Sequence, residues 1–137
     1  SLEEIFSSCK IVSIHSAMNE KTRGMIGKEH FDLLQDGSLF INTARGRIVR
    51  EEEMIEALKE NRFRALLDVY YEEPLALDSE LRNLPNVYCM PHMAGPTIDR
   101  RPFITKRLAD NMVMFEQGKE MNLEISAEYA KRMTVGG

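Results

Sequence analysis

The sequence lacks the features of membrane, secreted and nucleic-acid-binding proteins. No apolar run approaches the roughly 18 residues of a transmembrane helix, and the first residues read as a helix rather than as a signal peptide. Two cysteines among 137 residues make no disulfide framework and suit a reducing cytoplasm. The net charge of -4 argues against a nucleic-acid or anionic membrane partner. These absences favour an ordinary globular protein of the cytoplasm.

Metal-binding patterns are missing as well. The three histidines and two cysteines are not spaced like the ligands of a metal site. We interpret the acidic run at residues 51–53 as the first turn of a helix, where carboxylates offset the exposed amide groups. The sequence therefore predicts no metal site.

Strand-like and helix-like segments alternate along most of the chain. Strands are predicted at Lys10–His15, Ser38–Thr43, Arg64–Val69 and Val87–Met90. Helices are predicted over residues 2–8, 28–34, 51–61 and 101–117, with one more between residues 122 and 133 that begins at Ser126. This alternation predicts an α/β fold with a mostly parallel sheet and helices on both faces.

Three chemically useful side chains follow successive strand ends. Arg45, Glu73 and His92 come after the second, third and fourth predicted strands. Parallel strands end at one edge of a sheet, about 4.8 Å apart, so we expect these side chains to converge there. A lone histidine or Glu-Pro pair at such a place is usually structural, but three together amount to an anion clamp with an acid/base pair.

The motifs around these strand ends match one family in order and in spacing. They are Ile14-His15 with Thr22-Arg23-Gly24, Asn42-Thr43-Ala44-Arg45-Gly46, Asp68-Val69 with Glu73-Pro74, and Pro91-His92 with Gly95 and Thr97. The sequence resembles the C-terminal half of the D-isomer-specific 2-hydroxyacid dehydrogenases, the phosphoglycerate dehydrogenase-like family. The resemblance implies half of a Rossmann-type doubly wound parallel sheet of about four strands plus C-terminal helices. Residues 1–120 would form the second half of an NAD-binding domain, and residues 121–137 a tail returning toward a substrate domain.

The resemblance also implies an activity, which is the interconversion of 2-oxo acids and D-2-hydroxy acids by hydride transfer with NAD(H). NADP is left open. Arg45 would hold the substrate carboxylate through two parallel hydrogen bonds from its planar guanidinium. His92 would donate the proton to the nascent alkoxide, and Glu73 would bond the other ring nitrogen, fixing the tautomer and favouring the charged imidazolium.

Cofactor contacts carry over from the family to the loops at the same edge. Asp68 closes a buried strand and needs a hydrogen-bond donor, and in the family the matching aspartate meets the nicotinamide carboxamide. The remaining positions that match cofactor contacts are Ser16, Ala17, Thr43, Ala44, Arg45, His92, Met93, Ala94 and Gly95.

Some residues depart from the family pattern. The family usually has proline and threonine at the positions of Ala17 and Asn19, aspartate at Arg50 and glycine at Ala94. Residues 18–20 are closer to the C-terminal-binding-protein corepressor branch. A non-catalytic NAD(H)-sensing or assembly protein on the same scaffold therefore stays open, as does a degenerate gene remnant.

The glycine-rich motif G-x-G-x-x-G does not occur in the sequence. The acidic residue that would hold the adenosine ribose is missing with it. The chain also lacks an initiating methionine, so we interpret it as a piece of a longer protein. Alone it would bind NAD poorly and turn over nothing. The strand at Lys10–His15 would then be an exposed edge that pairs with a missing segment or with a second copy, as in a homodimer, or that promotes aggregation.

Overall fold

The computed structural model describes residues 1–133. The described residues divide into two compact units, residues 1–93 with Met133 and residues 94–132. The predicted tail at 121–137 falls partly on residues 134–137, which lie outside the described residues. The predicted domain boundary at residue 120 stays a prediction.

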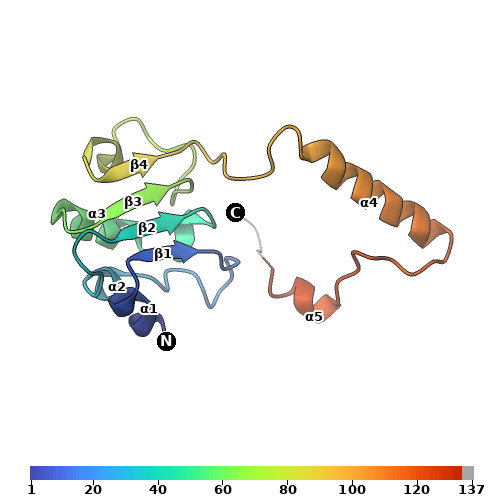
Figure 1. Ribbon diagram of the computed structural model, residues 1–137, viewed down its shortest axis with the longest axis horizontal. Coiled ribbons are helices and arrows are strands. Elements are labelled where there is room, and N and C mark those ends of the chain that lie inside the picture. Colours follow the sequence, from blue (N-terminus) through green and yellow to red (C-terminus); the bar gives the residue numbers. More distant parts are fainter. Residues whose placement is uncertain (134–137) are drawn as a thin grey trace. The chain divides into compact units, whose positions relative to one another are not determined.

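A parallel sheet of four strands forms the centre of the first unit (Figure 1). The strands are β1 (Ile11–Ile14), β2 (Leu39–Asn42), β3 (Arg64–Leu67) and β4 (Val87–Cys89), and they lie in the order β1-β2-β3-β4. All four arrows in Figure 1 point to the same edge of the sheet. The α/β fold class is confirmed, and each observed strand is one or two residues shorter than the predicted one.

Three helices cover one face of this sheet. They are α1 (Leu2–Ser8), α2 (Lys28–Phe31) and α3 (Glu51–Lys59), and two short 3-10 turns, η1 (Gly46–Ile48) and η2 (Glu80–Asn83), complete the unit. Phe40 of β2 packs against Phe6 of α1 and Phe31 of α2, with ring centroids 6.2 and 5.1 Å apart. Leu58 of α3 belongs to the same buried cluster. Right-handed connections between strands in sequential order bring all connecting helices to one face.

The other face of the sheet is open within residues 1–93. Side chains alternate along each strand, and on this face Ile11 is 63% and Tyr88 59% exposed. The prediction of helices on both faces therefore holds for one face only in this unit. No strand in residues 1–133 pairs with the outer edge of β1, so its pairing with a second copy stays a prediction.

The second unit contains α4 (Arg101–Glu116) and α5 (Ala127–Ala130). Pro102 lies in the first turn of α4, where a missing amide proton costs nothing. Ser126 begins α5 as predicted, because its side chain accepts a hydrogen bond from the amide of Tyr129. Across residues 1–133, no helix combines the length and the apolar character that crossing a membrane requires.

Candidate active site

Glu73 and His92 meet at the edge where β3 and β4 end. The Oε2 atom of Glu73 lies 2.5 Å from Nδ1 of His92, and its Oε1 atom accepts a hydrogen bond from the amide of Tyr70 at 3.1 Å. The His92 side chain is 47% exposed, which leaves the imidazole open to a ligand. With one nitrogen on a carboxylate, such an imidazole has a fixed orientation and tautomer.

The backbone at His92 is in the left-handed region, with φ of 51°. Histidine adopts this conformation more often than most residues, but it costs free energy, and such residues cluster at functional sites. The turn points the residues after β4 back toward the end of β3. The amide of Met93 donates to Oδ1 of Asp68 at 2.7 Å, and Asp68 is 1% exposed. The sequence predicts that the buried Asp68 carboxylate needs a hydrogen-bond donor, and the Met93 amide is one such donor.

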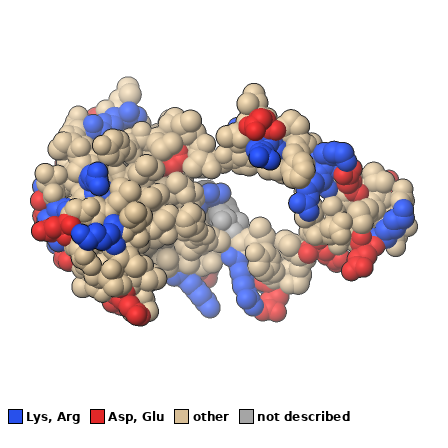
Figure 2. All heavy atoms as spheres, viewed as in Figure 1, with Lys and Arg blue, Asp and Glu red and all other residues tan. Residues whose placement is uncertain are grey.

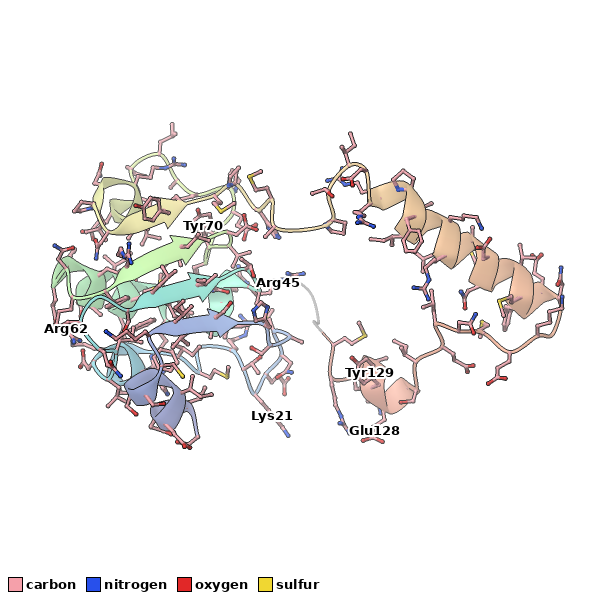
Figure 3. All side chains as sticks on the ribbon, in the orientation of Figure 1. Lys21, Arg45, Arg62, Tyr70, Glu128 and Tyr129 are labelled. Carbon is pink, nitrogen blue, oxygen red and sulfur yellow. The ribbon has the colours of Figure 1, made fainter. Side chains whose placement is uncertain are left out.

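Arg45 lies at the same edge, after β2 (Figure 3). Its Nη1 atom donates to the carbonyl of Ala44 at 2.6 Å. Asn42 shapes the turn beneath it, because its Nδ2 donates to the Arg45 carbonyl and its Oδ1 accepts from the Ala44 amide, both at 3.1 Å. Within residues 1–133 no hydrogen bond or ion pair joins Arg45 to Glu73 or His92. The structure thus brings Glu73 and His92 into contact, and the Arg45 guanidinium bonds neither of them among the described residues.

The predicted cofactor residues are spread over several loops. Thr43 and Ala44 are half-buried at the end of β2, and Met93 is 61% exposed. The Oγ atom of Ser16 is buried and has no hydrogen-bond partner among residues 1–133. The carbonyl of Ala17 accepts a bond from the Thr22 hydroxyl at 2.8 Å. Ala94 and Gly95 belong to the second unit. All these cofactor roles stay predictions.

A cavity of about 410 Å³ opens beside the pair, with Tyr70, Glu73, Cys89 and His92 among its lining residues. This volume lies in the range of small-molecule pockets. In the described part of the chain, no group of three His, Cys, Asp or Glu residues could hold a metal ion.

Arg50 has a structural role that its position alone did not reveal. It forms an ion pair with Glu29 and donates to Glu53 at 2.8 Å and to the Gly24 carbonyl at 2.7 Å. The bond from Arg50 lowers the pKa of the Glu29 carboxyl below its usual value. The residue ties the loop of residues 16–27 to the start of α3. The acidic residues near the starts of α2 and α3 suggest in the sequence that a basic residue could pair with them. Only the fold shows that this residue is Arg50.

The profile of one protein family matches the whole of residues 1–93. It is the NAD binding domain of the D-isomer specific 2-hydroxyacid dehydrogenases, and it matches residues 1–94. The chain belongs to this family. The resemblance noted in the motifs is therefore confirmed, and the domain is an NAD-binding one.

Known members of the family agree with this assignment. The chain is 37% identical over 120 residues to a glyoxylate reductase of Aeropyrum pernix, which covers 87% of this chain and 36% of the relative. The structure of Rhodotorula graminis D-mandelate dehydrogenase superposes with a TM-score of 0.83 at 29% identity, over 92% of this chain and 37% of that one. A family member from Xanthobacter autotrophicus, solved in complex with NADPH, gives a TM-score of 0.80 at 30% identity, over 93% of this chain and 41% of that one. The chain thus spans about two fifths or less of each relative.

Proposed function

We propose that this chain carries the substrate-facing residues of an NAD(H)-dependent oxidoreductase that interconverts 2-oxo acids and D-2-hydroxy acids. The observation that carries the proposal is the hydrogen bond between Glu73 and His92 at the end of parallel strands. The names of the relatives, a glyoxylate reductase and a D-mandelate dehydrogenase, support this class of substrate.

Each residue of the proposed site has a distinct task. The nicotinamide, when bound, supplies the hydride to carbon 2 of the substrate. Arg45 binds the substrate carboxylate through two parallel hydrogen bonds. His92 donates a proton from Nε2 to the oxygen on carbon 2 and takes it back in the oxidation direction. Glu73 holds Nδ1, which keeps the ring aimed at the substrate and stabilises its positive charge.

The residues present fit parts of the cofactor. The buried Ser16 hydroxyl, which has no hydrogen-bond partner among residues 1–133, would gain one from a polar atom of the ribose or pyrophosphate. Asp68 offers a buried carboxylate whose position is fixed by the Met93 amide. The solved relative with NADPH leaves the choice between NAD and NADP to experiment.

The sequence has no G-x-G-x-x-G motif to bind the pyrophosphate, so the 137-residue chain alone should bind NADH weakly and catalyse no turnover. Titration of NADH fluorescence with this chain tests the expectation. Saturation at micromolar cofactor would contradict it.

The activity itself is measured on the full-length protein that contains this chain. We expect oxidation of NADH or NADPH with at least one of glyoxylate, hydroxypyruvate, pyruvate or phenylglyoxylate, and a D-configured product from the prochiral substrates. Cofactor binding without turnover of any 2-oxo acid would favour the NAD(H)-sensing or assembly protein instead. The open sheet face, with Ile11 and Tyr88 exposed, is the observation that supports assembly.

We also propose a homodimer in the cytoplasm. The outer edge of β1 has no partner strand in residues 1–133, and an exposed edge favours pairing with another chain. Cys9 and Cys89 are both free thiols, as a reducing compartment requires. Light scattering of the 137-residue chain tests this pairing, and a monomer at all concentrations would contradict the proposed homodimer.

A further inference from the structure

Tyr70 links the ends of two strands through its hydroxyl group. The residue follows β3 and its side chain is buried, with 6% of the residue exposed (Figure 3). The hydroxyl lies 2.9 Å from the carbonyl of Leu67 in β3 and 2.8 Å from the carbonyl of Met90, which follows β4. The single hydroxyl proton is shared between the two carbonyls, so one phenol group bridges the two strand ends from which Glu73 and His92 depart.

The main chain of Tyr70 contacts the other parts of the site. Its amide donates to Oε1 of Glu73 at 3.1 Å, which leaves Oε2 for His92. Its carbonyl lies so close to Gly46 that a Cβ atom there would come within 1.9 Å. Gly46 directly follows Arg45, so the turn that bears the guanidinium also packs on Tyr70.

The hydroxyl is a dependable donor. Burial, followed by the neighbouring Cys89 thiol, raises the pKa of the Tyr70 phenol, so the group keeps its proton across the neutral range. The Met90 carbonyl lies two residues before His92, whose left-handed backbone needs surrounding contacts to hold it. The Tyr70 hydroxyl is one of those contacts.

We propose that Tyr70 is a positioning residue for the Glu73–His92 pair. Its amide orients the carboxylate, and its hydroxyl anchors the strand end that carries the imidazole. Calling the pair catalytic rests on the proposed function, but the positioning itself can be measured without cofactor or substrate.

Ring nitrogen shifts of the histidines in the ¹⁵N-labelled chain test the proposal. At a pH where the imidazole is neutral, we expect the wild type to carry its proton on Nδ1 of His92, facing Glu73. Tyr70→Phe should move the His92 ring shifts in the same direction as Glu73→Gln, which removes the carboxylate charge and no longer fixes one tautomer of the imidazole. The shifts of His15 and His30 should not change, because neither residue lies at the ends of β3 and β4 and each has a hydrogen bond of its own.

Tyr71→Phe is the matched control, because Tyr71 is 49% exposed and its ring contacts the Arg47 guanidinium. It should leave all three histidines unchanged. Unchanged His92 shifts in Tyr70→Phe would overturn the proposal, and so would equal changes in all three histidines, which would mean a general loss of structure. In the full-length protein, Tyr70→Phe should lower kcat about tenfold with little change in KM, a part of what a positioned acid contributes.

Discussion

The two halves of the candidate site differ in how the chain holds them. At the ends of β3 and β4, the Glu73 carboxylate accepts hydrogen bonds from both His92 and Tyr70. At the end of β2, the Arg45 side chain donates only to the adjacent Ala44 carbonyl within the described residues. Hydrogen bonds within the chain thus hold Glu73 and His92 together, whereas the Arg45 guanidinium bonds neither of them.

The difference fits the tasks that we propose for the two halves. A proton moves only over a short, aligned hydrogen bond, so the imidazole must be oriented in advance. A carboxylate offers two oxygens to the fork of an arginine, and the two groups align each other as they bind. Loss of the first half should therefore lower the rate constant, and loss of the second half should weaken substrate binding.

Among variants that keep His92, the largest effect is expected from Glu73→Gln in the full-length protein. The amide is nearly isosteric but no longer fixes one tautomer of His92, so kcat should fall by about 10²-fold, within the range of general acid catalysis. Steady-state kinetics with the best 2-oxo acid measures this. The neighbouring exposed Glu72→Gln is the control and should retain wild-type kcat. Equal rates for both variants would remove Glu73 from the mechanism.

Arg45→Lys should act on the other half. Lysine keeps the charge but loses the two-pronged hydrogen bonding, so KM for the 2-oxo acid should rise about tenfold, with a smaller change in kcat. Arg47→Lys is the control, because Arg47 bonds the Tyr71 carbonyl instead. A KM unchanged by Arg45→Lys would show that the carboxylate binds elsewhere.

Asn42→Ala should destabilise the turn that carries Arg45. Asn42 is 2% exposed and bonds both the Ala44 amide and the Arg45 carbonyl. Its removal leaves the Ala44 amide without a partner among the described residues and the Arg45 carbonyl with the Ile48 amide alone. We expect a loss of about 1–3 kcal/mol in the free energy of unfolding, measured by urea denaturation of the 137-residue chain. The exposed Asn83→Ala should change it by less than about 0.5 kcal/mol. Equal midpoints for the two variants would refute the role of Asn42.

The smallest effect concerns Glu51, which accepts a hydrogen bond from the Tyr71 amide at 2.7 Å. Burial raises the pKa of the Glu51 carboxyl above its ordinary 4.5. The folded state therefore holds this proton more tightly than the unfolded state, and the stability from this group falls as pH rises from 4.5 through the raised value. Glu51→Gln removes the titrating carboxyl and with it this fall in stability. Relative to wild type it should gain stability between pH 4 and 7, and parallel pH profiles would contradict the assignment.

Much of the fold and part of the site could be predicted from the sequence. Parallel strands end at one edge, so the contact between Glu73 and His92 follows from their places after β3 and β4. The accounting of buried polar groups likewise predicts that Asp68 needs a donor. The catalytic and cofactor roles of these residues stay predictions.

Other features depend on tertiary contacts that local sequence does not encode. The helix predicted over residues 28–34 ends at Phe31. Beyond it the amides of Leu33 and Leu34 bond back three residues, and the Arg62 guanidinium donates to the carbonyls of Phe31, Asp32 and Leu34. The role of Tyr70 depends on a carbonyl 20 residues away, and an aromatic residue after a strand reads simply as core.

The charged surface residues show the same difference between what the sequence predicts and what depends on tertiary contacts. Acidic and basic side chains are distributed over the visible face of the molecule (Figure 2). Sequence identifies them as solvated, but it does not single out Arg50, whose bonds join Glu29, Glu53 and the Gly24 carbonyl. Pairing of that kind becomes visible only when the loop of residues 16–27 lies against the start of α3.

The most direct measurement is the reduction of a 2-oxo acid by the full-length protein with His92→Ala beside wild type. If His92 is the acid that protonates the substrate oxygen, kcat at saturating cofactor should fall by about 10² to 10⁴. A variant that reduces the substrate at the wild-type rate would contradict the assignment of the strand-end pair as the acid/base centre.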